Sequence, residues 1–405
     1  MRFLLIAGSN SLSHVVKCLA VREALIDEGH RVILAASKKF TDFLNKAGID
    51  FSLVPDIQEA DDSTLPTAEW FRQPERIEAC IRAEADVIKK SSPDRVMGAF
   101  HFTSKASSRL AGVPFDSFAC GCMLPDSNEV LGFINGEPGF ETQKENMYHF
   151  FGYAGAKISK ALLRLGLDGI KDARSMLRGD RTFLWDFPEF MPIKPQPDLF
   201  HIGPVTWNGW TDFDGAGDME RRYQDTKFCV VGFGTCRHPH QAVARIVNIL
   251  LALDYKVFVA AGGQTGLINS LPDHPGIMKS LYCCMDKILP YASLVVTHGG
   301  QMTIFEALRH KVPLLVLPSH PEQDHNGACL ERMGCGRRIT PPQPFRGNPR
   351  VYHDAFSKIT DLQLSETIDE LVSDPDLEAR LARASETVNK YAGASSIASI
   401  LSKSI

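Results

Sequence analysis

The stretch from Leu289 to Asn326 constrains this chain more than any other, because short apolar runs alternate there with a glycine turn and a helical pattern. Its letters read LPYASLVVTHGGQMTIFEALRHKVPLLVLPSHPEQDHN. The pattern predicts a strand over Leu294–Thr297, a helix over about Gln301–His310 and a second strand over Leu314–Leu317, followed by a polar loop. Apolar strands alternating with helices, here and across most of the chain, indicate doubly wound parallel sheets.

Two glycines, Gly299 and Gly300, lie where the predicted helix begins. Because they carry no side chains, a ligand can approach the unpaired backbone N–H groups of the first turn, where the helix dipole favours a phosphate. Thr303 and Glu306 are three residues apart and share one helix face, about 5 Å apart along the axis. A hydroxyl suits a phosphate oxygen and a carboxylate suits the two ribose hydroxyls, so the stretch predicts nucleotide binding.

This stretch resembles the donor-binding signature of nucleotide-sugar glycosyltransferases with two Rossmann-like domains. It is most similar to the bacterial macrolide-type members and their plant and animal UDP-glycosyltransferase relatives, glycosyltransferase family 1. The residues that carry the resemblance are His298-Gly299-Gly300, Thr303, Glu306-Ala307-Leu308, Val312-Pro313, Pro318, Glu322-Gln323 and Asn326. The resemblance implies that His298 and Thr303 meet the pyrophosphate and that Glu306 holds the ribose. Glu322-Gln323 stands where the family has an Asp-Gln pair for the sugar hydroxyls, and this replacement leaves the sugar open.

The resemblance also implies further contacts with the donor. Tyr282 falls where relatives carry a Trp that stacks on the base, and an ordinary aromatic residue at a strand end is the equal alternative. Gly234 and Thr235 follow the first strand of the second half and resemble the family's glycine-serine loop beside the phosphates. The Gly262-Gly263 pair is predicted to be a turn at a strand end.

In the N-terminal half, His14 opens a predicted helix directly after the first strand. Side chains in this position face the cleft at the carboxyl ends of parallel strands. The family has Gly-His-Val-x-Pro here, and its His is the general base toward the acceptor hydroxyl, so the resemblance assigns that role to His14. Ser13 replaces the Gly and Lys17 replaces the Pro. Without the resemblance, a helix cap or a surface residue is the more common role of such a His.

Many relatives orient the catalytic His with an Asp after a later strand, whereas this chain has Gly98 and Ala99 at the matched position. His101 is close in sequence and is one candidate for the cleft, although a surface or capping role is favoured. The implied reaction is direct displacement of the nucleoside diphosphate. No metal and no cofactor are expected, since the family needs none and the chain has no Asp-x-Asp tract near the phosphate site.

The bulk properties limit the classes of protein that fit. A chain of 405 residues with 44% hydrophobic and 23% charged residues is long enough for two globular domains. The net charge of −4 gives no long-range attraction to nucleic acid. The first apolar run ends at Gly8 and is too short for a signal peptide, so a cytoplasmic location is expected. The ten scattered cysteines fit reduced core thiols, and the histidines His238, His240, His320 and His325 are expected to face solvent rather than bind metal.

The predicted fold class is α/β with GT-B architecture, which consists of two Rossmann-like, doubly wound parallel-sheet domains facing a cleft. Residues 1–206 form the predicted acceptor domain, 207–226 the linker, 227–384 the donor domain and 385–405 a C-terminal helix that crosses back to the first domain. The segment Tyr148–Leu167 is rich in Phe, Tyr and Leu. It is equally well interpreted as an apolar wall for a lipophilic acceptor or as a core or interface helix.

The leading expectation is transfer of a sugar from a UDP- or dTDP-linked donor to a hydroxyl of a small or lipid alcohol. A catalytically weak relative that binds nucleotide sugar or activates a partner enzyme is one alternative, and a nucleotide-sugar 2-epimerase on the same fold is another. The sequence leaves membrane association and the oligomeric state open.

Overall fold

The computed structural model describes residues 1–59, 67–209, 226–235, 239–341 and 349–403. The chain divides into two compact units. Unit 1 comprises Met1–Glu129, Lys144–Trp207 and Tyr391–Ile405, and unit 2 comprises Val130–Gln143 and Asn208–Lys390. Each unit contains one parallel sheet with helices on both faces, so the predicted α/β class is confirmed. Most of the predicted linker, residues 210–225, lies outside the described residues.

The sheet of unit 1 has seven strands in the order β3-β2-β1-β4-β5-β6-β7. They are β1 (Arg2–Ala7), β2 (Arg31–Ala36), β3 (Ser52–Leu53), β4 (Arg95–Ala99), β5 (Phe115–Ala119), β6 (Thr182–Leu184) and β7 (Leu199–His201). The helices are α1 (Leu12–Asp27), α2 (Thr41–Lys46), α3 (Pro74–Ser91), α4 (Ser104–Ala111), α5 (Phe140–Arg164) and α14 (Ala394–Ser402). The core beside the central strands is formed by Leu4, Ile6, Ala35, Val54, Ile88, Val96 and Phe115.

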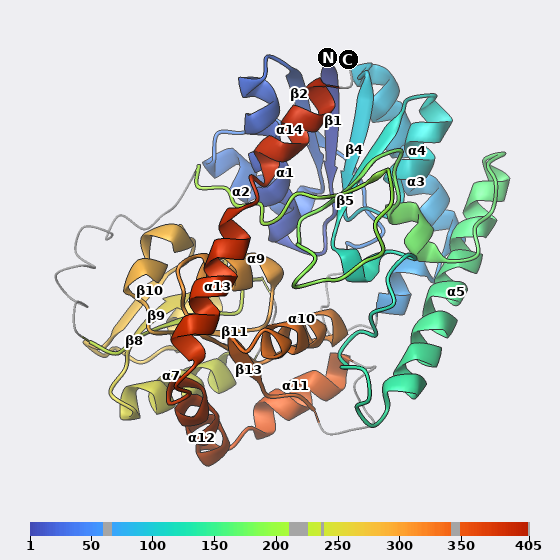
Figure 1. Ribbon diagram of the computed structural model, residues 1–405. Coiled ribbons are helices and arrows are strands. Elements are labelled where there is room, and N and C mark those ends of the chain that lie inside the picture. The colour runs from blue at the N-terminus through green and yellow to red at the C-terminus, as the bar shows by residue number, and fades with distance from the viewer. Residues whose placement is uncertain (60–66, 210–225, 236–238, 342–348, 404–405) are drawn as a thin grey trace. The chain divides into compact units, whose positions relative to one another are not determined.

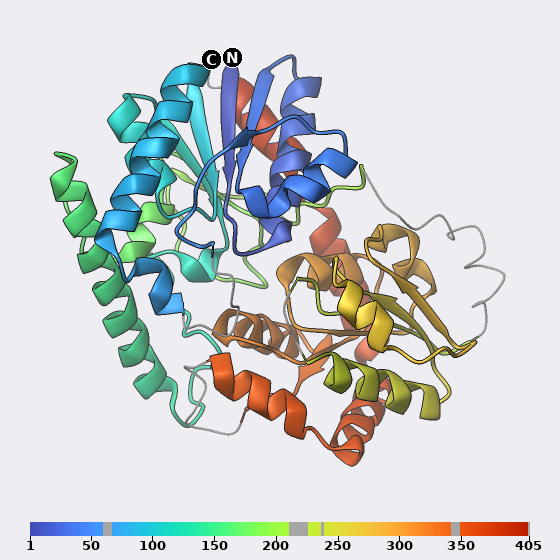
Figure 2. The ribbon, with the colours of Figure 1, turned by 180° about the vertical axis from the view of Figure 1, so that it is seen from behind.

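The helices of unit 1 lie on opposite faces of this sheet. α1 and α14 pack together on one face, and α3 and α4 pack together on the other (Figures 1 and 2). The imidazole Nε2 of His30 lies 3.0 Å from Ser402 Oγ, so a hydrogen bond links the end of α14 to the residue before β2. The last helical segment therefore belongs to the unit that contains the N-terminus.

The sheet of unit 2 has six strands in the order β10-β9-β8-β11-β12-β13. They are β8 (Phe228–Gly232), β9 (Lys256–Ala260), β10 (Ile277–Ser280), β11 (Leu294–Thr297), β12 (Leu314–Val316) and β13 (Gly336–Arg338). The helices are α7 (His240–Ala252), α8 (Thr265–Ser270), α9 (Gln301–Arg309), α10 (Pro321–Arg332), α11 (Pro349–Lys358), α12 (Asp361–Val372) and α13 (Leu377–Asn389). α9 packs on α13 on one face, and α7 packs on α8 on the other (Figures 1 and 2).

Both sheets reverse their strand order at one point, between β1 and β4 in unit 1 and between β8 and β11 in unit 2. In an open parallel sheet the crossover connections diverge there, and they leave a crevice at the carboxyl ends of the strands. His14 follows β1, and His298 follows β11. The two histidines singled out in the sequence thus lie at the switch points of the two sheets.

Three elements differ from the predicted pattern. The predicted polar loop after β12 becomes helical at Pro321, a residue that suits the first turn of a helix because its missing N–H is not needed there. The single predicted C-terminal helix is two helices, α13 and α14, separated by a break that includes Gly393, whose φ is +55°. The segment Tyr148–Leu167, interpreted as an apolar wall or as a helix, belongs for most of its length to the 25-residue helix α5, which begins earlier, at Phe140, and ends at Arg164.

Residues 130–143, which the sequence analysis placed in the N-terminal domain, pack with unit 2. The guanidinium of Arg338 on β13 explains this, since its Nη1 donates to the Gly132 carbonyl at 3.1 Å and its Nη2 to Glu137 Oε1 at 2.7 Å. Arg338 also pairs with Asp324 and Glu331, at 2.7 and 2.8 Å. A buried guanidinium needs such partners, and they tie the segment to the sheet edge.

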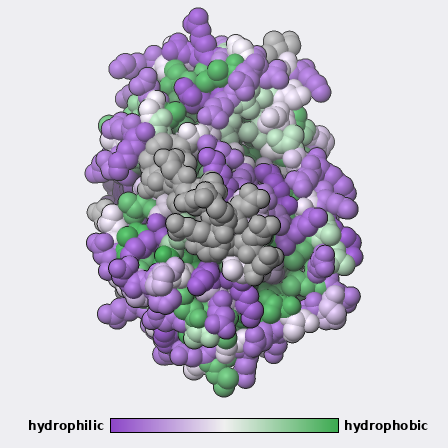
Figure 3. Space-filling model, turned by 90° about the vertical axis from the view of Figure 1, so that its left-hand side faces the viewer, coloured by the Kyte–Doolittle hydropathy of each residue, from purple (hydrophilic) through white to green (hydrophobic). Residues whose placement is uncertain are grey.

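No helix among the described residues is long and apolar enough to cross a membrane. On the face shown in Figure 3, hydrophilic side chains cover most of the surface and hydrophobic ones form scattered smaller areas.

Candidate functional site

The turn between β11 and α9 holds His298, Gly299 and Gly300 in a close-packed arrangement. Gly299 has a φ of +91°, and a Cβ on it would lie 2.7 Å from the Gln323 carbonyl oxygen. A Cβ on Gly300 would lie 2.7 Å from Nε2 of His298. Gly299 therefore requires glycine, and a side chain at Gly300 would force the His298 ring to move. Gly300 is the N-cap of α9 and gives no side-chain hydrogen bond to the first turn, at the end of the helix where the dipole favours an anion.

The imidazole of His298 is partly exposed and packs against the loop that follows β8. Its Nδ1 donates a hydrogen bond to the Gly232 carbonyl at 3.4 Å, which orients the ring. Burial by the surrounding protein lowers the pKa of His298 to about 4, so the ring is neutral at pH 7. An anion that binds beside the ring would favour the charged form and raise this pKa.

The predicted phosphate-side glycine, Gly234, is brought to His298 by the fold. Its φ is +54°, and a Cβ there would lie 3.1 Å from Cε1 of His298. Thr235 follows in the same turn. The Gln264 amide donates to the Gly234 carbonyl at 2.8 Å, which fixes the loop from the β9 side. The loops after β8 and β11, far apart in sequence, thus meet at the switch point.

Tyr282 lies in the same region, after β10. A Cβ on Gly263 would lie 2.4 Å from the Tyr282 hydroxyl oxygen, so the ring packs directly on the turn after β9. Gly262, with a φ of +58°, packs equally closely on the Gly234 carbonyl. The predicted turn at Gly262-Gly263 is confirmed, and it joins the Tyr282 ring to the phosphate-side loop.

Thr303 and Glu306 both lie on α9, as the spacing predicts. Thr303 is partly exposed in the first turn, and Glu306 is buried. The pKa of the Cys284 thiol is raised by burial and further by the negative charges of Asp286 and Glu306. The Glu306 carboxylate is therefore near the loop that follows Tyr282.

Glu322 and Gln323 lie in the first turn of α10, where the sequence analysis had expected a loop. The Gln323 side chain is buried, and its Oε1 accepts hydrogen bonds from the Ser319 N–H at 2.9 Å and the Ser319 hydroxyl at 2.6 Å. Glu322 Oε1 accepts from the Asn326 amide at 2.8 Å, and the same amide nitrogen donates to the Gly299 carbonyl at 2.9 Å. Asn326 thus connects this helix to the His-Gly-Gly turn.

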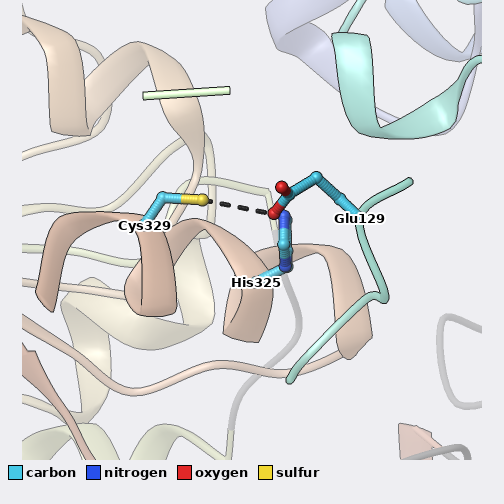
Figure 4. Close-up of side chains that lie close together, drawn as sticks. All are labelled: Glu129, His325 and Cys329. Carbon is cyan, nitrogen blue, oxygen red and sulfur yellow. Dashed lines mark hydrogen bonds between the residues drawn. The ribbon is translucent and has the colours of Figure 1, made fainter. Parts of the chain in front are cut away.

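His325 does not face solvent as expected, because the helical continuation of α10 buries it. Its Nε2 lies 3.6 Å from Cys329 Sγ, one turn along the helix (Figure 4). The two side chains share the buried face of α10. His320 lies at the N-cap of this helix and is partly exposed, whereas His238 is outside the described residues.

In unit 1, His14 is in the first turn of α1, whose N-cap Ser11 accepts a hydrogen bond from the Ser13 N–H at 3.2 Å. The imidazole is only 7% exposed, so it is neither a cap nor a surface residue. It stacks on Phe100 and Trp185 with centroid distances of 5.1 and 5.6 Å. Burial first, and then the Lys17 charge, holds the pKa of His14 well below 6.5, so the ring is a neutral proton acceptor at pH 7.

His101 is buried as well, at 1% exposure, and the surface or capping role favoured by the sequence is wrong. Its Nε2 lies 3.5 Å from Asp56 Oδ2 and 3.9 Å from Glu84 Oε1. Both carboxyl groups are buried, and they come from the loop after β3 and from α3. Sequence reasoning missed Asp56, Glu84 and Trp185, since no local pattern marks them; Lys17 was visible only as a departure from the family motif.

Comparison with known proteins shows what this chain is similar to. The model of the glycosyltransferase family 28 C-terminal domain matches residues 269–341, which contain most of the donor-side residues described above. A curated protein of Mycobacterium bovis (strain BCG / Pasteur 1173P2), named PGL/p-HBAD biosynthesis rhamnosyltransferase, is 23% identical over 346 residues, covering 83% of this chain and 76% of its own. An uncharacterized glycosyltransferase of Methanosarcina acetivorans is 21% identical, with 85% and 87% covered.

Solved structures of glycosyltransferases share the fold over the whole chain. The spinosyn rhamnosyltransferase complexed with spinosyn aglycone has a TM-score of 0.70 at 16% identity, covering 99% of this chain and 100% of its own. The glycotransferase of kitacinnamycin has a TM-score of 0.69 at 19% identity, covering 99% and 98%. This chain has the GT-B fold and is similar to UDP-glycosyltransferase-type proteins, and it is a glycosyltransferase that uses nucleotide-sugar donors.

Proposed function

We propose that this enzyme transfers a sugar from a dTDP- or UDP-linked donor to a hydroxyl of a small lipophilic acceptor, with His14 as the general base. The observation that carries the proposal is the cluster of His298, Gly234 and Gly300 around the uncapped start of α9. It combines close-packed backbone, the N-terminal end of a helix and an imidazole, which together suit a pyrophosphate.

The remaining donor contacts extend from this phosphate site. Thr303 would add a hydroxyl donor in the first turn of α9, and Glu306 one turn later would accept hydrogen bonds from the ribose. The Tyr282 ring would stack on the base. Glu322 and Gln323, held beside the His-Gly-Gly turn through Asn326, would contact the sugar hydroxyls.

Two structural neighbours support the proposed nucleotide and the proposed class of acceptor. One neighbour with a TM-score of 0.65 at 14% identity, covering 100% of this chain and 99% of its own, is a glycosyltransferase in complex with dTDP. This favours dTDP over UDP as the first nucleotide to test. The neighbour complexed with spinosyn aglycone supports a lipophilic acceptor, as do the aromatic rings of Phe100 and Trp185 beside His14.

In the proposed reaction the acceptor oxygen forms a bond to the anomeric carbon while the bond from that carbon to the diphosphate oxygen breaks. The acceptor proton moves to the neutral His14 ring, and the nucleoside diphosphate leaves with the electron pair. The charge on the leaving group would be stabilised by His298 and by the N–H groups of α9, so no metal is required in this scheme.

The test is calorimetric binding of dTDP, UDP, GDP and ADP to the purified protein. We expect dTDP or UDP to bind with a clear preference, and we expect His298→Ala to lose this binding. His274→Ala is the matched control. His274 precedes β10 and lies at the amino ends of the strands, whereas His298 follows β11 at their carboxyl ends. Failure of all four nucleotides to bind would overturn the donor site.

Product analysis with the selected donor then separates the three functions. A new glycoside supports transfer, and an epimerised donor identifies a 2-epimerase. Binding without turnover identifies a relative that only binds nucleotide sugar or acts through a partner enzyme.

A further inference from the structure

The position where relatives carry a carboxylate for the catalytic histidine has no room for one in this chain. Gly98 and Ala99 end β4 and are buried. A Cβ on Gly98 would lie 2.9 Å from Ser104 Oγ and 3.1 Å from the Phe115 ring. The group that orients His14 must therefore come from another part of unit 1.

A buried polar cluster lies one step further along the chain. His101 faces the carboxyl groups of Asp56 and Glu84 through Nε2, and its Nδ1 lies 2.8 Å from the Ser104 hydroxyl. The Ser107 hydroxyl donates to Glu84 Oε2 at 2.6 Å. Five polar side chains thus meet inside the core. Their burial costs free energy that the hydrogen bonds and ion pairs among them offset, and apolar side chains would fill the same space without that cost.

Backbone contacts fasten the cluster to the turn that carries His14. The Ser9 N–H, in the turn between β1 and α1, donates to Asp56 Oδ2 at 2.7 Å. The Gln58 N–H donates to Asp56 Oδ1 at 3.0 Å. A Cβ on Gly8 would lie 2.5 Å from the Phe100 carbonyl oxygen, so the β1 turn packs directly against the residue before His101.

Phe100 connects His101 to His14. Its φ is +49°, a left-handed conformation that is strained for a bulky residue. In this conformation its ring stacks on the His14 imidazole. Among the described residues, His101 Nε2 is buried without a hydrogen-bond partner. The two rings are close enough for the charge of His101 to lower the pKa of His14.

We propose that His101, backed by Asp56, is the positioning residue for His14 and replaces the carboxylate that Gly98 and Ala99 exclude. The inference rests on the general-base role of His14 proposed above. With Asp56 holding His101, the backbone of the neighbouring Phe100 would be fixed, and the Phe100 ring that stacks on His14 would set the plane of the imidazole. Other charges that act on His14 come from Lys17 on its own helix and Lys39 after β2, and both oppose protonation.

Opposite shifts in two variants test the proposal. Asp56→Asn removes a negative charge, so the pKa of His14 should fall by about one pH unit. His101→Gln removes a ring whose interaction with His14 lowers the pKa of His14, so that pKa should rise. Titration of the imidazole Cε1 signals in ¹³C-histidine-labelled protein measures both shifts without substrate, with His14→Gln to assign the signal.

The kinetic readout uses the donor selected by calorimetry and 4-methylumbelliferone as the acceptor probe. Both variants should lower kcat at least tenfold, leave nucleotide affinity unchanged, and shift the acidic limb of the pH profile in opposite directions. Asp116→Asn is the matched control for loss of a buried carboxylate, because Asp116 pairs with Arg95 and Arg181 near the amino ends of β4 and β5. It should lower thermal stability without changing the His14 titration.

The outcomes separate this inference from the proposed function. If His14→Ala abolishes transfer while both variants titrate like the wild type, the positioning role of His101 is overturned and the role of His14 stands. If His14→Ala retains full transfer, the general-base assignment itself fails. A variant that does not fold is replaced by Asp56→Glu, which keeps the charge and should retain the wild-type titration.

Discussion

The Asn326 side-chain amide donates a hydrogen bond to the Gly299 carbonyl at 2.9 Å. It joins α10 to the glycine turn before α9, across 27 residues of chain. The same amide donates to Glu322. Asn326 therefore holds the conformation of the proposed phosphate turn and the position of the proposed sugar-binding residues together.

We expect Asn326→Ala to weaken dTDP or UDP binding at least tenfold, because the Gly299 carbonyl loses its buried donor and the turn loosens. The unfolding free energy should fall by about 1–3 kcal/mol, the usual cost of an unsatisfied buried polar group. Calorimetry and thermal unfolding measure the two effects. Asn389→Ala is the control: its amide donates to Ser385 Oγ on α13, and its loss should leave nucleotide affinity intact.

Gly300→Ala tests the close packing of the turn on His298. The added Cβ would lie 2.7 Å from Nε2 of His298, so the ring must move. Nucleotide affinity should fall while the fold is retained, because the φ of Gly300 is −66° and alanine adopts it without strain. Gly152→Ala provides a comparison in α5, where nothing lies within 4 Å of the added Cβ and affinity should not change. Equal affinity in both variants would contradict the placement of His298 in the site.

The protonation of His298 should be linked to nucleotide binding. Its pKa is about 4 in the free protein, and a bound diphosphate should raise it. Between pH 4 and the raised pKa, the complex holds a proton that the free protein lacks, so binding takes up protons and affinity falls as pH rises through the bound-state pKa. Calorimetry in buffers of different ionisation enthalpy measures the uptake. His298→Gln should take up fewer protons, and identical uptake would count against a contact with the phosphate.

His14→Ala should lower sugar transfer by about 10²-fold or more, the usual effect of losing a general base. Nucleotide affinity should remain near the wild-type value, because His14 belongs to unit 1 and the nucleotide residues belong to unit 2. Steady-state kinetics with a saturating donor, together with calorimetry, separate the two quantities. A large loss of nucleotide affinity would instead place His14 in the donor site.

Lys17 contributes to the pH dependence that we expect for transfer. Its charge adds to burial in lowering the pKa of His14, so Lys17→Met should raise that pKa. Transfer requires the neutral base, and the acidic limb of the pH profile should therefore move to higher pH. Arg22→Met, also on α1, is a control for loss of a cation. An unchanged acidic limb in Lys17→Met would show that His14 does not set this limb.

The sequence predicted the elements whose signals are local. The apolar run at Leu294–Thr297 coincides with β11, and the helix predicted from Gln301 begins at that residue. Such runs and periodicities are visible because a buried strand or helix face requires apolar residues at positions that are close together in the sequence. The residues that carry the family resemblance occur in one continuous stretch for the same reason.

The site depends on contacts that no local pattern contains. Pro321 was interpreted as part of a loop, and only its packing in unit 2 makes it the start of α10, which buries His325 and positions Asn326. His101 gave no sign of burial in the sequence, because Asp56 and Glu84 are 45 and 17 residues away in the chain. Tyr282 and Gly263 are likewise joined only by the pairing of β9 with β10.

The sequence by itself thus determined the fold class, the resemblance to nucleotide-sugar glycosyltransferases and the residues proposed to bind the nucleotide. The tertiary structure decided which charges surround each histidine and which rings and carboxyl groups are buried. The physical reason is that a strand or a helix is selected by residues close in sequence, whereas burial and the pKa of an imidazole are set by groups that only folding brings together.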